Sequence, residues 1–171
     1  MIITPYDSFT RPANTTAYAQ GDLIANSVTA ASVVPLKFNI TPVSMRRGCI
    51  GFVRVAKSNA TATLATFKLH LFTSAPVVTN GDNGALQVAS TEGWIGTVAC
   101  DMATGGFAKA TTGLKKRFQC LGASDLPSLL CFDAVSENFL YGLLEADAAY
   151  TPASGELFKV TLEIGDDGGL R

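Results

Sequence analysis

The chain has 171 residues, of which 47% are hydrophobic and 16% charged, and its formal net charge is −1. This length indicates one domain, because single domains commonly hold about 100–200 residues. The mean hydropathy of +0.26 argues against a disordered chain. The near-balance of 13 basic and 14 acidic residues argues against nucleic-acid binding. Because His70 is the single histidine, sites built on several histidines are also excluded, and we expect no metal ion or other cofactor.

Residues 1–21 show no regular period of apolar residues. They carry three aromatic side chains, Tyr6, Phe9 and Tyr18, in a stretch punctuated by proline and asparagine. Such a segment is either an extended arm whose aromatic side chains need a neighbouring surface, or a loop folded back on its own domain. We assign residues 1–21 to an extended N-terminal arm and residues 22–171 to the folded domain, which is then expected to fold without the arm.

Strand-like patterns follow from residue 22 onward. Residues 66–73 alternate between apolar and polar side chains, and residues 158–164 do so most clearly, which places Glu163 on the solvent side of its strand. The other candidate strands are 23–28, 34–40, 49–57, 95–101, 106–111, 116–121, 128–134 and 138–146. About nine or ten short strands predict an all-β domain, a single β-sandwich of the jelly-roll type.

Helical signal is weak. A short helix is predicted over 82–89, where Asp82 is able to cap it, and a turn over 124–129 is limited by Pro127. We therefore expect at most one or two short helices. His70 lies on the polar side of its strand and is interpreted as an exposed or interface histidine. Since no set of residues converges on a catalytic role, we predict that the chain is not an enzyme.

The first residues contain neither the basic region nor the long apolar region of a secretory signal. No window reaches the roughly 18 consecutive apolar residues of a membrane helix. We therefore expect a soluble protein made in a cytoplasm, with no membrane partner.

The four cysteines occur without a C-x-x-C pair, which argues against structural zinc. They are Cys49, Cys100, Cys120 and Cys131. The simplest interpretation is that all four are reduced and buried in strands, because cysteine is among the most buried residue types. A disulfide formed after release from the cytoplasm is the alternative.

Two basic clusters, Arg46–Arg47 and Lys115–Lys116–Arg117, stand near predicted strand starts. Each is either a solvated loop or a contact for an acidic partner surface. Neither has the interleaved aromatic side chains of a single-strand binder. The candidate interaction residues are therefore Tyr6, Phe9, Arg11, Tyr18, Arg46, Arg47, Lys115, Lys116 and Arg117.

Four segments resemble small structural proteins of tailed bacteriophages and prophages. They are FTRPANTTAYAQGDLIA (9–25), FKLHLF (67–72), YGLLEADAAYTP (141–152) and SGELFKVTLE (154–163). The resemblance implies a head decoration (cement) protein, which binds the major capsid protein where capsomers meet and is commonly trimeric. It also implies location in the host cytoplasm during assembly and on the head surface of the virion afterwards. It assigns no site residues to this chain.

Two other functions stay open at the level of the sequence. One is a tail or neck component of the same virion. The other is a carbohydrate-binding jelly-roll module, in which Trp94 would stack on a sugar. The competing interpretation, which the sequence favours, is that Trp94 is a buried or half-buried core residue.

Overall fold

The structure is a computed structural model that describes residues 2–40, 47–120, 128–133 and 138–165. Its strands are β1 (Ile2–Ile3), β2 (Tyr6–Thr10), β3 (Leu23–Ile24), β4 (Leu36–Asn39), β5 (Gly48–Lys57), β6 (Thr66–Phe72), β7 (Trp94–Asp101), β8 (Ala108–Ala110), β9 (Gly113–Gln119), β10 (Leu130–Phe132), β11 (Phe139–Ala146) and β12 (Leu157–Gly165). Within these ranges the one helical element is a 3-10 turn, η1 (Ala30–Ser32). The all-β class is thereby confirmed.

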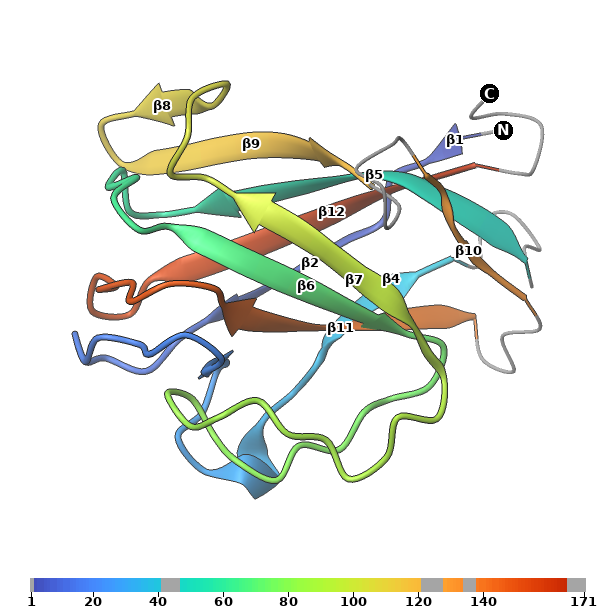
Figure 1. Ribbon diagram of the computed structural model, residues 1–171, viewed down its shortest axis with the longest axis horizontal. Helices are drawn as coiled ribbons and strands as arrows, with labels where there is room; N and C mark the ends of the chain where they lie inside the picture. The colour runs from blue at the N-terminus through green and yellow to red at the C-terminus, as the bar shows by residue number, and fades with distance from the viewer. Residues whose placement is uncertain (1, 41–46, 121–127, 134–137, 166–171) are drawn as a thin grey trace.

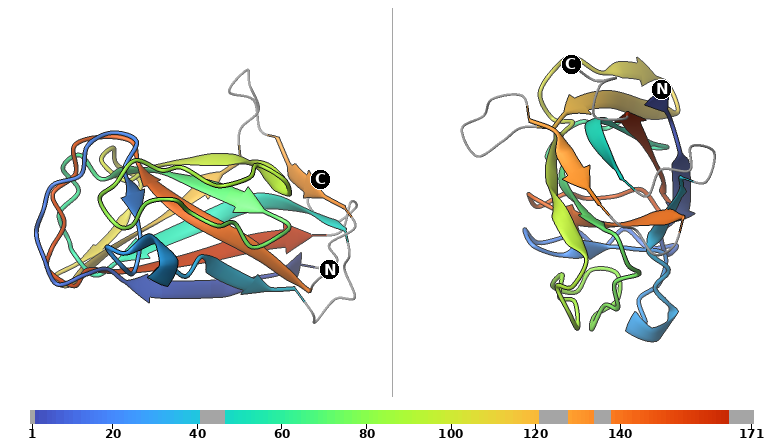
Figure 2. Two further views of the ribbon diagram at one scale, coloured as in Figure 1. Left: turned by 90° about the horizontal axis from the view of Figure 1, so that it is seen from below. Right: turned by 90° about the vertical axis from the view of Figure 1, so that its right-hand side faces the viewer.

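Two antiparallel sheets pack face to face as a sandwich (Figure 1, Figure 2). One sheet contains the order β2-β12-β5-β9, extended by β1, β8 and β10, and the other contains β4-β11-β6-β7, extended by β3. Among the eight strands of these two orders, the first in the chain pairs with the eighth, the second with the seventh, the third with the sixth and the fourth with the fifth. This is the order of one long hairpin rolled up on itself, the jelly roll, so the predicted sandwich is confirmed.

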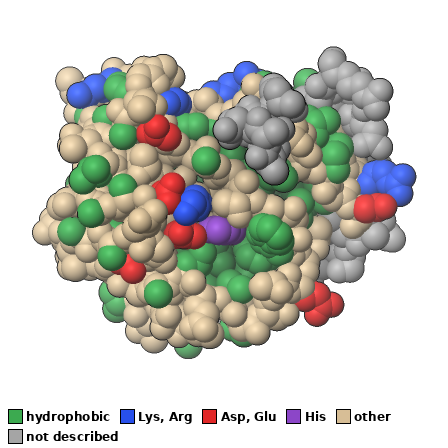
Figure 3. Space-filling model, in the orientation of Figure 1, with side chains coloured by type: hydrophobic (Ala, Val, Ile, Leu, Met, Phe, Trp, Pro, Cys, Tyr) green, Lys and Arg blue, Asp and Glu red, His purple; other side chains and the backbone are tan. Residues whose placement is uncertain are grey.

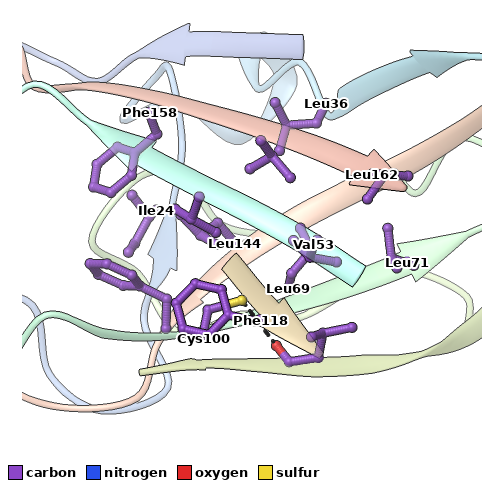
Figure 4. Close-up of a cluster of buried hydrophobic side chains, with 14 of the residues drawn as sticks. Ile24, Leu36, Val53, Leu69, Leu71, Cys100, Phe118, Leu144, Phe158 and Leu162 are labelled. Carbon is purple, nitrogen blue, oxygen red and sulfur yellow. Dashed lines mark hydrogen bonds between the residues drawn. The ribbon is translucent and has the colours of Figure 1, made fainter. Parts of the chain in front are cut away.

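The space between the sheets is filled by inward-facing side chains from both of them (Figure 4). β12 has the alternation that its sequence predicts, with Phe158, Val160, Leu162 and Ile164 fully buried. Removing apolar surface from water contributes about 25 cal/mol per Å². Burial of these alternating positions, together with those of the other strands, therefore stabilises the sandwich.

A second, smaller apolar cluster lies on the outer face of the β4-β11-β6-β7 sheet. Phe72, Tyr141 and Leu143 belong to this cluster and not to the main core, and they project outward. Two segments, residues 25–34 and 73–93, cover them and are called the loop layer below (Figure 1). The two segments are joined by backbone hydrogen bonds such as the one that the Asp82 N–H donates to the Ser27 carbonyl at 2.7 Å.

Residues 2–21 do not form a separate arm, which corrects the domain boundary predicted at residue 21. β2 pairs antiparallel with β12 over its whole length, and β1 pairs with the far end of β12. Tyr18 lies in the main core. The chain uses this segment as the first strand of the jelly roll, because β12 would otherwise be an open sheet edge. Of the two interpretations of residues 1–21, the segment folded back on its own domain is therefore the one that agrees with the structure.

The predicted helix over 82–89 is wrong. The Asp82 carboxylate does not cap a helix but accepts hydrogen bonds from the Arg11 and Tyr18 side chains and from the Ala25 N–H. Asn83 follows with φ of 64°, outside the helical region. Tertiary hydrogen bonds thus overrode the local capping signal. The second candidate turn lies largely outside the described residues.

Cys49 on β5 and Cys131 on β10 form a disulfide, which corrects the prediction of four reduced thiols. The two residues face each other across the antiparallel pair, with their Cα atoms 4.0 Å apart. Cys100 and Cys120 are free and buried, as predicted. Burial raises the pKa of both thiols, that of Cys120 to about 11, which favours the protonated thiol over the thiolate at neutral pH.

Candidate functional site

The outer face of the β4-β11-β6-β7 sheet changes from apolar to charged along its strands. Cross-strand neighbours share a face, so the register of β11, β6 and β7 defines successive rows of outward side chains. The rows are Tyr141, Phe72 and Trp94; then Leu143, His70 and Thr97; then Glu145, Lys68 and Ala99. Along each strand the rows are about 7 Å apart. The loop layer covers only part of the apolar row, and the candidate site forms where this cover ends.

A hollow of about 290 Å³ opens at the boundary between the apolar and charged rows (Figure 3). Its lining residues are His70, Phe72, Leu86, Val88, Thr91 and Trp94. Figure 3 shows hydrophobic side chains beside the single histidine, and charged side chains on the other side of that histidine. The hollow is therefore apolar inside and charged along one margin.

A β-bulge turns Trp94 outward beside this hollow. Regular pairing continues to Leu71 opposite Gly96 and then skips Ile95, so that Trp94 stands opposite Phe72. Ile95 packs against the main core, whereas Trp94 is 54% exposed. In a regular strand Ile95 would face Phe72 and the indole would turn to the opposite face of the sheet. The preference for a core tryptophan is therefore wrong.

The turn before Trp94 holds the indole in this place. Gly93 has φ of 78°, a conformation that favours glycine, and a Cβ there would lie 2.4 Å from Ser74 Oγ. The Gly93 carbonyl accepts a hydrogen bond from the Thr73 N–H at 2.7 Å. The Ser74 hydroxyl donates to the Glu92 carbonyl at 3.3 Å. These bonds fix the backbone that carries the indole.

His70 is held in one orientation at the margin of the hollow. Its Nε2 lies 2.6 Å from a carboxylate oxygen of Glu145, and its Nδ1 lies 2.9 Å from Thr97 Oγ1. Carboxylate, imidazole and hydroxyl in this order can activate a nucleophile. The hollow, however, is lined by His70 and not by Thr97. The two contacts therefore orient the imidazole as part of the wall of the hollow. His70, predicted to be exposed or at an interface, is partly buried.

Lys68, Glu145 and Asp147 form the charged margin of the site. Lys68 Nζ lies 2.7 Å from Asp147 Oδ1 and 3.6 Å from Glu145 Oε1. The hydrogen bond to Asp147 raises the pKa of Lys68, and the same bond holds the pKa of Asp147 below its ordinary value. Gln20 donates a further hydrogen bond to Asp147 at 3.2 Å. The margin thus offers an ammonium donor beside two carboxylate acceptors.

Arg11 and Tyr18, predicted as interaction residues, are instead buried in an internal network. Each is only 2% exposed. Arg11 Nη2 lies 3.0 Å from Asp82 Oδ2, and the Tyr18 hydroxyl donates to Asp82 Oδ1 at 2.6 Å. Burial raises the pKa of the Tyr18 hydroxyl far above its ordinary value. Their role is therefore corrected: they join the N-terminal segment to the loop layer and are not available to a partner.

A second buried network joins β5 to the segment before β12. Lys57 Nζ donates to Tyr150 Oη at 2.9 Å and lies 3.3 Å from Glu156 Oε1. Burial lowers the pKa of Lys57. Across the described ranges, Thr66 Oγ1 is the buried side-chain polar atom that lacks a hydrogen-bond partner. The interior charges are thus paired within the fold and stabilise it.

Tyr6 and Phe9 lie on opposite sides of β2. Phe9 is partly buried and stacks on Phe158, with ring centroids 5.7 Å apart. The Tyr6 ring is exposed and lies 3.7 Å from Lys159 Nζ. Of the two predicted aromatic anchors, Tyr6 has the accessible ring.

The first predicted basic cluster is only partly described. Arg46 lies outside the described residues. Arg47 is exposed and pairs with Asp133, at 2.9 Å. Exposed pairs of this kind contribute about 1 kcal/mol or less, so Arg47 is able to exchange its partner for another carboxylate.

The second predicted basic cluster, on β9, is divided between internal contacts and solvent. Lys115 is exposed. Lys116 Nζ donates to a backbone carbonyl at the end of β7 at 2.6 Å. Arg117 bonds Glu163 through both carboxylate oxygens, and its guanidinium lies 3.4 Å from the centroid of the Phe52 ring. Glu163, expected on the solvent side, is covered by these contacts and buried.

The hollow is the part of the site that the sequence did not predict. Leu86 and Val88 come from the segment predicted to be helical, and no local pattern indicates that they cover a sheet. The available signal was the string Gly93-Trp94-Ile95-Gly96, because glycine within a strand often marks a bulge.

No group of three or more His, Cys, Asp or Glu side chains is placed to hold a metal ion in the part of the chain that the structure describes. In the same ranges no helix is long and apolar enough to span a membrane. The structure is thus a jelly-roll domain with a largely apolar hollow on its surface. No family model matches the sequence, and no curated protein matches it.

Proposed function

We propose that this chain is a structural protein of a tailed-bacteriophage virion, a head decoration protein that binds the major capsid protein and stabilises the lattice as a homotrimer. The four segments quoted above resemble that class of protein. The jelly roll supports the proposal, since viral capsid domains are among the proteins built on this fold.

The observation that carries the proposal is the set of large apolar side chains left exposed. Among the described residues, those at least 40% exposed are Ile2, Tyr6, Val28, Val34, Leu64, Val77, Trp94 and Leu157. Four of them, Val28, Val34, Val77 and Trp94, lie on or beside the loop layer. A contiguous exposed apolar patch marks an interaction site, and in this proposal the four side chains belong to one contact surface. A cement protein acts through many modest interfaces that symmetry repeats.

The test is binding of the full-length chain to phage heads assembled without it. We expect saturable co-sedimentation, and image reconstructions with trimeric density where capsomers meet. Density on the tail or neck would establish the alternative location and contradict the decoration role. Failure to bind any part of the particle would contradict a structural role altogether.

A matched pair of variants tests the exposed apolar surface. Val77→Asp places a charge on this surface and is expected to weaken head binding about tenfold, because interface cores exclude charge. Lys109→Ser changes an exposed position on β8, away from the loop layer, and is expected to leave binding unchanged. Equal binding by both variants would show that the loop layer is not part of the surface that contacts the head.

A further inference from the structure

We propose that the hollow beside Trp94 binds a neutral glycan of at least two sugar units. One ring stacks on the indole, and the hydroxyl groups of the next ring bond to the charged margin formed by Lys68, Glu145 and Asp147. This inference does not depend on the decoration role, because the isolated chain carries the whole site.

The fold places the indole where a ligand can reach it. The skipped residue Ile95 turns Trp94 onto the outer face, and the glycine turn at Gly93 fixes the backbone there. Bulges commonly re-aim a side chain next to a binding or active site. The apolar C–H face of a pyranose ring packs against an aromatic face such as this one. Phe72 lies in the floor of the hollow beneath the same position.

The charged margin supplies what the hydroxyl groups of a sugar need. Each hydroxyl both donates and accepts, whereas an ammonium only donates and a carboxylate only accepts. Lys68 and Asp147 are about one-third exposed, so both are accessible from the hollow side of the sheet. The two carboxylates repel anionic ligands, which favours a neutral glycan. Lys68, Glu145 and Asp147 pair with one another, and a sugar hydroxyl is able to join these pairs by donating to a carboxylate or accepting from the ammonium.

The spacing of the rows sets the length of the ligand. Phe72, opposite Trp94, and Lys68 are four residues apart on β6, which is about 13 Å along the strand. The backbone positions that carry the stacking ring and Lys68 are thus separated by more than the width of one sugar ring, so we assign a second ring to the contact with Lys68. A hollow of about 290 Å³ takes the first ring, and the second ring lies over His70 toward Glu145.

The chain has one tryptophan, so tryptophan emission, excited selectively over that of the four tyrosines, reports on Trp94. The full-length chain is first applied to an array of neutral oligosaccharides, and the strongest disaccharide is then titrated while tryptophan emission is recorded. We expect a saturable change in emission, with the corresponding monosaccharide binding about tenfold more weakly. No array signal from the native chain would overturn the proposal. Equal affinity for the monosaccharide would overturn the assigned length.

Variants separate the stacking residue from the fold. Trp94→Ala is expected to abolish the array signal and Trp94→Phe to retain part of it, because a phenyl ring also stacks. Val77→Ala, at an exposed apolar position outside the hollow, is the matched control and is expected to bind normally. Binding that survives Trp94→Ala would overturn the proposal. 1-Hexanol serves as a probe for an apolar side chain. A saturable emission change with 1-hexanol and none with any sugar would also overturn the proposal, because the occupant of the hollow would then be apolar.

Discussion

Two Arg–Asp pairs in this chain differ in the surroundings of their charges. The side chains of Arg11 and Asp82 have no exposure to solvent, whereas those of Arg47 and Asp133 are 68% and 66% exposed. Breaking a buried pair leaves an uncompensated charge in the interior. Breaking an exposed pair returns both charges to water. The exposed pair of Arg47 and Asp133 therefore serves as a control for the free energy lost when the buried pair of Arg11 and Asp82 is broken.

Arg11→Leu is expected to lower the free energy of unfolding by about 3–5 kcal/mol, because the Asp82 carboxylate is left buried without its cation. Arg47→Leu, the matched change at the surface, is expected to cost about 1 kcal/mol or less. Urea denaturation followed by circular dichroism measures both. Similar losses for the two variants would contradict the structural role assigned to the buried network.

Stability is expected to decrease on acidification below about pH 5. The hydrogen bonds from Arg117 hold the pKa of Glu163 below its ordinary value of 4.5. Between the folded and the unfolded pKa the unfolded chain binds more protons, so the stabilisation is present above the unfolded pKa and is lost as the pH falls through the folded one. Asp147 contributes with the same sign, through Lys68.

Glu163→Gln tests this linkage. It is expected to cost about 1–3 kcal/mol near pH 7, because the hydrogen bonds that Arg117 donates lose their charged acceptor. It is also expected to make the loss of stability between about pH 5 and pH 3 shallower. Thermal melting across this range measures the slope. If the melting temperature of the variant fell with pH as steeply as that of the native chain, carboxylates other than Glu163 would account for the loss of stability in acid.

At the scale of the elements, a covalent bond joins β10 to its neighbouring strand. β10 has three residues, which pair with β5, and the disulfide joins the middle residue to that strand. Short edge strands contribute little stability alone. The disulfide between Cys49 and Cys131 therefore keeps this edge of the sheet closed.

Reduction of the disulfide is expected to lower the free energy of unfolding by about 4 kcal/mol, because the bond closes a long loop in the unfolded chain. The sequence separation of the two cysteines is 82 residues. Urea denaturation with and without dithiothreitol measures the effect. The Cys49→Ser/Cys131→Ser variant is the control and should not respond to the reductant. A native chain equally stable in both conditions would contradict the role of the bond.

At the scale of the whole molecule, the N-terminal segment completes the fold. β2 pairs with β12, the Arg11 side chain reaches Asp82 in the loop layer, and Tyr18 fills the core. A segment that contributes a strand, a buried charge and a core aromatic is not dispensable. The jelly roll is thus closed by residues that the sequence alone assigned to an arm.

Removal of residues 1–21 is therefore expected to abolish cooperative unfolding, because an open β12 edge and an unpaired Asp82 charge remain. Removal of residues 1–4 takes away only the two-residue strand β1 and is expected to preserve the fold. Near-ultraviolet circular dichroism and thermal melting compare the two. A shortened chain lacking residues 1–21 that melts cooperatively near the temperature of the full chain would restore the arm interpretation.

The fold was largely predictable because strand patterns are local. The alternation in β6 and β12 and the apolar runs of β5 and β11 identify their own buried faces. The site was less predictable. Trp94 depends on a register skip between two strands, and the hollow depends on a loop layer that comes from elsewhere in the chain. The glycines beside Trp94 indicate that a bulge is possible, but no local pattern indicates which residue is skipped or that the loop layer covers this sheet.

The sequence by itself determined an all-β sandwich with one tryptophan, one histidine and a nearly neutral charge. Only the tertiary structure decided that Arg11 and Tyr18 face inward, that Cys49 meets Cys131, and that Trp94 faces outward. The physical reason is that burial and pairing depend on partners far apart in the chain, whereas alternation depends on immediate neighbours. Local sequence patterns therefore predict the class of fold, whereas long-range contacts determine which side chains are available to a partner.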